Sequence, residues 1–187
     1  MSHQLILASS SPRRQALLRQ VNMNFTVRKQ DTDESIVKAS DPREKVEQLA
    51  LLKARNTEIM DKGEVIVTAD TVVSYQNQIF GKPEDDKDAY TMLSTLSGQV
   101  HEVYTGVAIR ANAEEIFFTE KTSVEFWTLS DEDIMSYIST RDPFDKAGGY
   151  GIQSEGAVLV RSIHGDYYNV VGLPISRVVR ELRGVIG

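Results

Sequence analysis

Runs of apolar and β-branched residues predict a set of strands along the chain. The most distinct run, residues 65–69, is typical of a strand that is buried on both of its faces. Gln76-Asn77 predicts a tight turn, and residues 111–114 separate two long runs and predict a hairpin. The expected strands are residues 4–8, 25–28, 64–75, 79–80, 100–110, 115–127 and 157–163.

Helix-start signals lie between these strands. Asp41-Pro42-Arg43-Glu44 combines an acidic N-cap, a proline at the first helical position and a glutamate three residues after the cap. The helix that follows is expected to run to about Met60, where Lys62-Gly63 would end it. Ser11 is the expected N-cap of an earlier helix that begins at Pro12. The apolar stripe of that earlier helix is expected to consist of Ala16, Leu17 and Val21.

Three further helices and one long loop complete the predicted order of elements. Ser130 and Asp133 form a Ser-x-x-Asp cap for a helix over residues 130–139, and Gly98 is the expected stop of a helix over 85–96. A final helix is expected at 174–182, and the polar, acidic residues 31–39 predict a loop. Helices and strands alternate, but a hairpin is present. The fold class expected is therefore α/β, with a mixed twisted sheet and flanking helices.

Composition restricts the possible classes of protein. The chain has 187 residues, 21 of them Lys or Arg and 27 Asp or Glu, which gives a formal charge of −6. This length fits a single domain over residues 1–187, or two closely packed lobes around a cleft. The absence of cysteine excludes a disulfide framework, a zinc ribbon and a cysteine nucleophile.

Charge and hydropathy also bear on location and partners. The apolar run at residues 5–8 is too short for a signal peptide, and no run reaches the roughly 20 apolar residues of a membrane span. A cytoplasmic protein that binds neither membrane nor nucleic acid is therefore expected, because nucleic-acid binders usually carry a basic face. An anionic ligand stays compatible with the acidic balance, since a few cations in a cleft can outweigh distant negative charge.

The first segment with candidate chemistry is Ser9-Ser10-Ser11-Pro12-Arg13-Arg14, between a predicted strand and a predicted helix. Small hydroxyl residues at a positive helix end suit a phosphate, and the two arginines add planar donors for phosphate oxygens or a base edge. The same residues also fit a well-capped helix with two solvated arginines.

Three other segments carry candidate chemistry. A carboxylate at Asp70, in a strand expected to be buried, needs a hydrogen bond, an ion pair or a metal, although it could instead cap a turn. Lys82, in Gly81-Lys82-Pro83, suits a phosphate or is an ordinary exposed lysine. Residues 141–153 are glycine-rich, aromatic and charged, which favours close contact with a ligand; the alternative is a floppy surface loop.

The absence of known motifs argues against a zinc hydrolase and against an acyl-serine mechanism. The three histidines are scattered with no His-Glu-x-x-His pair, and no Gly-x-Ser-x-Gly elbow is present. Residues 141–153 lack both the order of a dinucleotide-binding loop and the Gly-Lys-Ser/Thr ending of a P-loop. Oxygen ligands and cations remain, and they fit magnesium-assisted chemistry on phosphates.

Five segments, taken together and in this order, resemble the Maf family of nucleoside triphosphate pyrophosphatases. They are Ser9-x-Ser11-Pro12-Arg13-Arg14, Ala69-Asp70-Thr71, Gly81-Lys82-Pro83, residues 145–153 and residues 165–174. The resemblance covers almost the whole chain. It implies a fold like that of inosine triphosphate pyrophosphatases, with two lobes around a cleft, and a homodimer. It also implies a divalent cation, Mg²⁺ or Mn²⁺, and cleavage of a nucleoside triphosphate to the monophosphate and pyrophosphate.

The resemblance assigns roles to individual residues. It implies Asp70 as proton acceptor, Lys53 and Lys82 as lysines that face the phosphates, and Glu34 with Asp70 as the metal-binding carboxylates. The phosphate-binding residues expected are Ser9, Ser11, Arg14 and Lys82. The residues that match the dTTP/UTP-selective branch are Arg13, Thr71 and Gln153.

Base recognition would follow from hydrogen-bonding chemistry. Gln153 can both accept and donate, Arg13 can only donate, and Thr71 is expected to adjust its hydroxyl. The family name derives from an inhibitory effect on septum formation, so the resemblance also points to a link with cell division. The alternative is a regulator of cell division that senses a nucleotide without turning it over.

Overall fold

The computed structural model describes residues 3–112 and 114–186, and its centre is a seven-stranded mixed sheet. The strand order is β2-β1-β3-β5-β6-β7, with β4 also paired to β3. β1 pairs in parallel with β2 and with β3, and all other pairs are antiparallel. The strands are β1 (Gln4–Leu7), β2 (Thr26–Val27), β3 (Glu64–Tyr75), β4 (Gln78–Phe80), β5 (Val100–Arg110), β6 (Glu115–Phe126) and β7 (Val160–His164).

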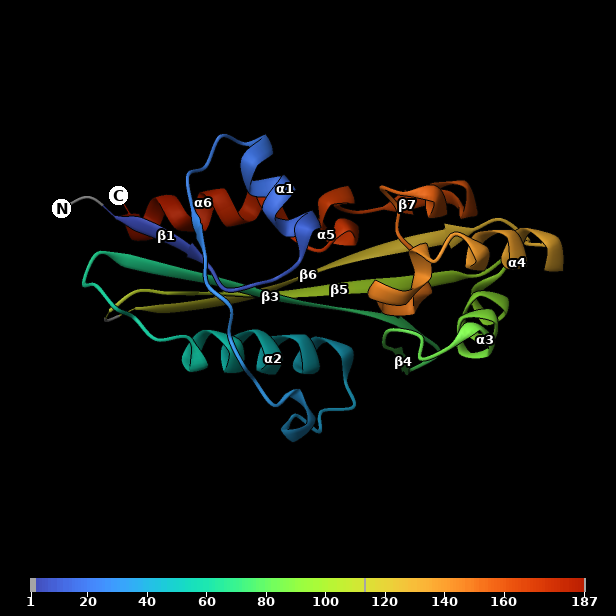
Figure 1. Cartoon of the computed structure of the whole chain (residues 1–187), viewed down its shortest axis with the longest axis horizontal. Helices are drawn as coiled ribbons and strands as arrows, with labels where there is room; N and C mark the ends of the chain where they lie inside the picture. Colours follow the sequence, from blue (N-terminus) through green and yellow to red (C-terminus); the bar gives the residue numbers. More distant parts are fainter. Residues whose placement is uncertain (1–2, 113, 187) are drawn as a thin grey trace.

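Helices cover both faces of this sheet (Figure 1). The α-helices are α1 (Pro12–Gln20), α2 (Pro42–Asn56), α3 (Asp86–Leu96), α4 (Asp131–Ser139), α5 (Tyr167–Val171) and α6 (Ile175–Ile186). Four short 3-10 helices are η1 (Glu34–Ile36), η2 (Asp142–Asp145), η3 (Ala147–Gly149) and η4 (Glu155–Leu159). Helix α2 lies on one face, whereas α1, α5 and α6 lie on the other face, and α3 and α4 lie at the far end of the long strands. No helix within the described residues is long and apolar enough to cross a bilayer.

Two large apolar clusters hold these layers together. One joins α1, α5 and α6 to the sheet through buried side chains such as Leu17, Val67 and Val178. The other lies around α3 and α4 and includes Leu93 and Phe126. Residues from both clusters line the cavity at which the candidate site lies.

One edge of β3 is left partly unpaired, and this opening creates the site. Along that edge β1 pairs only with Glu64 to Val67, and β4 pairs only with Val73 to Tyr75. β5 occupies the opposite edge continuously from Ile66 to Ser74. Within the described chain, residues 68–72 therefore have no strand beside them on the first edge, and Asp70-Thr71 lies at the middle of this gap.

Gly106 of β5 allows α2 to pack closely over the sheet beside this gap. A Cβ atom at this position would lie 2.4 Å from the backbone oxygen of Val46 in α2. Only glycine avoids that overlap. The close approach lets α2 present Lys53 to the strand that carries Asp70.

The predictions for most elements are confirmed. The mixed α/β class, the bounds of β3, the turn into β4, the helix ended near Gly98 and the Ser130–Asp133 capping box all agree with the structure. The hairpin is present as well, with Ala111 and Glu114 joined by backbone hydrogen bonds of 2.9 and 3.3 Å. Residue 113 of that hairpin lies outside the described residues.

Several predicted bounds were wrong. The helix expected to reach Met60 ends at Asn56, because Thr57 adopts an extended conformation and its hydroxyl donates to the Lys53 carbonyl. Residues 157–159 belong to η4, so β7 begins only at Val160. The predicted strand 25–28 is reduced to Thr26–Val27, and the expected loop contains η1. The final helix runs on to Ile186.

The first helix also differs in detail from its prediction. Ser11 is the N-cap residue, but its side chain makes no capping hydrogen bond. The buried stripe consists of Leu17 and Leu18, whereas Ala16 and Val21 are exposed. Both leucines belong to the apolar cluster that packs this helix against the sheet.

Candidate functional site

A cavity of about 700 Å³ opens at the unpaired edge of β3. Its volume lies in the range of about 300–1,000 Å³ that small-molecule sites usually have. Every residue that the sequence marked as a candidate lines it. These residues are Ser9, Ser11, Arg13, Arg14, Glu34, Lys53, Asp70, Thr71, Lys82 and Gln153.

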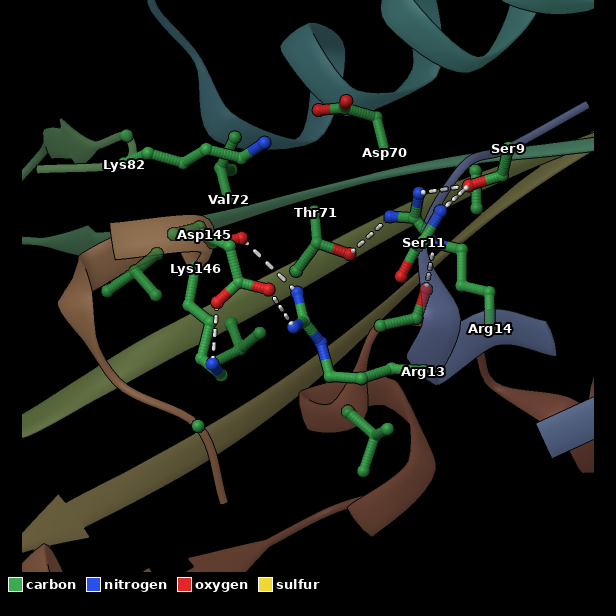
Figure 2. Close-up of a pocket in the computed structure, with 18 of the residues that line it drawn as sticks. Ser9, Ser11, Arg13, Arg14, Asp70, Thr71, Val72, Lys82, Asp145 and Lys146 are labelled. Atoms are coloured by element: carbon green, nitrogen blue, oxygen red, sulfur yellow. Dashed lines mark hydrogen bonds and ion pairs between the residues drawn. The ribbon is translucent and has the colours of Figure 1, made fainter. Parts of the chain in front are cut away.

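The cavity has two sides, because successive side chains of a strand point to opposite faces. Asp70 points toward α2, whereas Thr71 points toward α1 and α5 (Figure 2). Lys82 lies on the Asp70 side of β3, and Arg13 lies on the Thr71 side. The gap in strand pairing joins the two sides, so one ligand can reach both.

The Asp70 side combines carboxylates with lysines. Lys53 is 7 % exposed, and its Nζ lies 2.5 Å from Asp70 Oδ1 and 2.9 Å from Glu34 Oε1. Exposure to solvent increases from the buried Lys53 to the half-buried Asp70 and the largely exposed Glu34. Lys82 is exposed on the loop after β4. The side can therefore supply both positive charge for phosphates and carboxylate oxygens for a proton or a metal.

The carboxylates of this side fit a divalent cation only if substrate phosphates and water complete its coordination. Among residues 3–112 and 114–186, no group of three or more His, Cys, Asp or Glu gathers in a metal-binding arrangement. Glu34 and Asp70 converge on the same ammonium, so their oxygens lie close together. Mg²⁺ is often held by one or two carboxylates together with water and substrate phosphates. These two residues fit that mode.

On the Thr71 side of the cavity, Arg14 hydrogen-bonds to three separate segments of the chain. Its Nε donates to the Gly172 carbonyl at 2.8 Å, and its Nη2 donates to Thr71 Oγ1 at 3.2 Å. Its Nη1 donates to Ser9 Oγ at 3.3 Å. Burial lowers the pKa of Arg14, and the nearby charge of Asp70 partly opposes that effect. The guanidinium thus joins the segment after β1, strand β3 and the end of α5.

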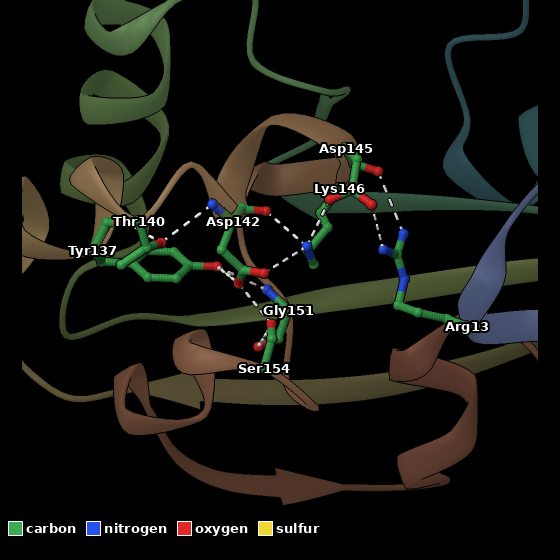
Figure 3. A network of polar contacts seen from close by, with 8 residues as sticks. All are labelled: Arg13, Tyr137, Thr140, Asp142, Asp145, Lys146, Gly151 and Ser154. Atoms are coloured by element: carbon green, nitrogen blue, oxygen red, sulfur yellow. Dashed lines mark hydrogen bonds and ion pairs between the residues drawn. The ribbon is translucent and has the colours of Figure 1, made fainter. Parts of the chain in front are cut away.

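Arg13 is held by a carboxylate far away in the sequence. Its Nη1 donates to Asp145 Oδ2 at 2.7 Å, and Asp145 Oδ1 accepts from Lys146 Nζ at 2.6 Å (Figure 3). Burial would raise the pKa of Asp145, but hydrogen bonds from Lys146 and Arg13 hold the pKa below its usual range. Asp145 stays ionised and fixes the direction of the Arg13 guanidinium at the cavity wall.

A buried network supports Asp145 from behind. Lys146 is 8 % exposed, and its Nζ also donates to Asp142 Oδ1 at 2.9 Å. Asp142 Oδ2 accepts from Tyr137 Oη at 2.7 Å and from Ser154 Oγ at 2.6 Å (Figure 3). Burial is the main reason that the pKa of Tyr137 is raised, so its hydroxyl stays protonated as a donor. The network anchors the segment that carries Asp145.

Residues 141–153 are therefore a packed wall, and the alternative of a floppy loop was wrong. Gly148 has a φ of +70°, and a Cβ atom there would lie 2.7 Å from Val73 Cγ2. The N–H of Gly148 donates to the Gly81 carbonyl at 2.9 Å, which ties this wall to the loop of Lys82. The glycines in this segment serve close packing.

Sequence reasoning assigned no role to Asp145, Lys146 or Asp142. The signal for them was present in the charged run of residues 141–146, which precedes the glycines. The pairing of Asp145 with Arg13 could not be read from the sequence, because these residues are 132 positions apart. Gln153 lines the cavity and is exposed.

Comparison with known proteins gives consistent matches. The family model described as "Maf-like protein" matches residues 4–185. A "dTTP/UTP pyrophosphatase" of Bacillus cereus is 47 % identical over 179 residues, covering 96 % of this chain and 94 % of the relative. A "dTTP/UTP pyrophosphatase" of Bacillus cytotoxicus is 49 % identical over 178 residues, covering 95 % of this chain and 93 % of the relative.

Proposed function

The chain belongs to the Maf family, and we propose that it is a nucleoside triphosphate pyrophosphatase that hydrolyses dTTP and UTP. The products are the nucleoside monophosphate and pyrophosphate. The observation that carries this proposal is the two-sided cavity at the free edge of β3. One side offers lysines and carboxylates suited to a triphosphate, and the other offers directional donors and acceptors suited to a base.

On the phosphate side, Asp70 acts as the general base. Its carboxylate accepts a proton from the water that attacks the α-phosphate, and the ion pair with Lys53 at 2.5 Å holds that carboxylate in place. Lys53 and Lys82 are compact positive charges, and they stabilise the phosphate oxygens and the pyrophosphate leaving group.

A divalent cation, Mg²⁺ or Mn²⁺, would be held by Glu34 and Asp70 and would supply further neutralisation of charge on the phosphates. The convergence of both carboxylates on one point supports this assignment. Lys53 then serves to keep the two carboxylates close together before the nucleotide arrives, since it attracts both.

On the base side, Arg13, Thr71 and Gln153 read the pyrimidine. Arg13 can only donate, so it suits a carbonyl oxygen of uracil or thymine and opposes the exocyclic amine of cytosine. Its fixed contact with Asp145 supports this role, because a tethered guanidinium has few alternative positions. Ser9, Ser11 and Arg14 line the passage between the base side and the phosphate side, where they suit phosphate oxygens.

The test is pyrophosphate release from a panel of dTTP, UTP, CTP, ATP and GTP, each with Mg²⁺ or Mn²⁺ and with EDTA as control. The proposal expects turnover of dTTP and UTP, with little from the others. Tight binding without turnover would support a nucleotide sensor instead, and preference for a purine would overturn the substrate. We further propose that the enzyme acts on free nucleotides in the cytoplasm, as a homodimer.

A further inference from the structure

A row of hydroxyl contacts runs from the base side of the cavity into the core. Thr71 Oγ1 lies 2.9 Å from Thr105 Oγ1, and Thr105 Oγ1 lies 3.0 Å from the Asn169 carbonyl oxygen. Arg14 Nη2 donates to Thr71 Oγ1 at 3.2 Å (Figure 2). Thr105 and Asn169 are both 0 % exposed, so water cannot replace any partner there.

The carbonyl end of this row sets the direction of every hydrogen bond in it. A carbonyl oxygen can only accept, so the proton between Thr105 and Asn169 must come from Thr105. A hydroxyl has only one proton, so Thr105 has none left for Thr71. The 2.9 Å contact between the two threonines then needs the proton of Thr71.

The reverse direction leaves two oxygen lone pairs facing each other. If Thr105 donated to Thr71, its oxygen and the Asn169 carbonyl oxygen would remain 3.0 Å apart with no proton between them. The Asn169 carbonyl cannot move away, because the Asn169 side chain donates to the Val103 carbonyl and to Thr122 Oγ1, each at 3.0 Å. The structure therefore favours one direction.

We propose that Thr105 is a positioning residue that makes Thr71 a hydrogen-bond acceptor toward the cavity, and so selects bases that carry an N–H at ring position 3. Thr71 accepts one bond from Arg14 and gives its proton to Thr105. Only a lone pair is left for a ligand. This inference rests on the proposed function and names how the same site distinguishes pyrimidines.

The consequence is selection of uracil and thymine over cytosine. Uracil and thymine carry a proton on N3, which the Thr71 lone pair can accept. Cytosine has a lone pair at N3, so its approach would place two acceptors against each other. In this arrangement the Thr71 hydroxyl has a fixed direction, in place of the adjustable hydroxyl expected from the sequence. Arg13 and Gln153 are then free to read the carbonyl oxygens.

The experiment removes the Thr105 hydroxyl and measures the ratio of kcat/KM for UTP to that for CTP. Thr105→Val keeps the shape but leaves the Thr71 proton without its internal acceptor, so it can turn toward the cavity. The ratio should fall about tenfold, the effect of one misdirected neutral hydrogen bond. Thr105→Ser keeps the hydroxyl and should restore the ratio.

Thr68→Val is the matched control. Thr68 is also 0 % exposed, and its hydroxyl donates to the Ala50 carbonyl at 2.7 Å, on the α2 face of the sheet. It should lose stability to a similar extent and keep the UTP-to-CTP ratio. If Thr105→Val does not fold, Thr105→Ala tests the same ratio with less steric demand.

The outcomes separate this inference from the proposed function. An unmodified protein that prefers UTP, together with an unchanged ratio in the folded Thr105→Val or Thr105→Ala variant, overturns only the inference. A fall in the ratio for Thr68→Val as large as for Thr105→Val would also overturn it. An unmodified protein that hydrolyses UTP and CTP equally, or neither, overturns both.

Discussion

Asp70→Asn tests the central assignment of the phosphate side. The substitution keeps the size and shape of the side chain but removes the negative charge and the proton acceptor. The amide oxygen could still accept a hydrogen bond from Lys53, whose Nζ lies 2.5 Å from Asp70 Oδ1, so the geometry of the wall should survive. Turnover of dTTP should fall about 10²- to 10⁴-fold, the usual contribution of a general base.

The stability effect of the same change should be modest. Removing one partner of a buried ion pair costs about 3–5 kcal/mol when the other charge is left alone. Lys53 is not left alone here, because Glu34 remains at 2.9 Å from its Nζ. We therefore expect a loss of about 1–3 kcal/mol. At roughly 2–4 °C per kcal/mol for a chain of this size, Tm should fall by several degrees.

Glu64→Gln is a matched control for this experiment. Glu64 begins the same strand, its side chain is 4 % exposed, and Arg28 Nη2 binds it at 2.5 Å. It does not line the cavity. Both variants therefore lose a largely buried ion pair of β3, but only Asp70→Asn loses the proposed base.

The assay is steady-state pyrophosphate release from dTTP at a temperature well below the Tm of each variant, with Tm measured in the same buffer. Glu64→Gln should keep turnover within a fewfold of the unmodified protein. Asp70→Asn with more than about a tenth of the original turnover would refute the general-base role. An equal loss in both variants would show that the ion pairs act through stability.

Three further predictions use other residues. Lys82→Ala should lower kcat/KM for dTTP and UTP by the same factor, because a phosphate-binding lysine does not read the base; a changed dTTP-to-UTP ratio would contradict this role. Asp145→Ala should raise KM for dTTP severalfold by freeing Arg13, with a stability change within about 1 kcal/mol because Asp145 is well exposed and the buried Lys146 keeps its ion pair with Asp142; an unchanged KM would exclude the tether. Hydrogen bonds from Arg28 lower the pKa of Glu64 to about 2, so its stabilisation should be complete above about pH 4.5 and lost as pH falls toward 2. Urea unfolding should show the difference between Glu64→Gln and the unmodified protein shrinking over that range, and a constant difference would contradict the linkage.

Local signals explain which parts of the fold could be predicted. β3 was bounded correctly at both ends because its apolar, β-branched run is flanked by Gly63 and by the Gln76-Asn77 turn. The end of α2 was missed because the side chain of Thr57 ends the helix, and no glycine or proline marks that point in the sequence. Helix α5 was not predicted from the sequence because it has only five residues and no helical periodicity.

The candidate residues were found for a related reason. Ser9 and Asp70 each stand in a loop or strand where a polar residue needs an explanation. Lys53 and Lys82 received their roles from the resemblance to the Maf family. Thr105 gave a weaker signal, since threonine is common in strands. Its importance comes from contacts with residues 34 and 64 positions away, which only the folded chain brings together.

The period of a β-strand explains how so short a motif can serve both halves of the site. Asp70 and Thr71 are neighbours, yet their side chains project from opposite faces of β3. In a fully paired sheet those faces would be separated by strands on both sides. Here β1 stops at Leu7, opposite Val67, and the pairing with β4 starts at Val73, so the edge between them is open and the two faces communicate. Under the proposed function, the gap in pairing would let one nucleotide place its phosphates beside Asp70 and its base beside Thr71.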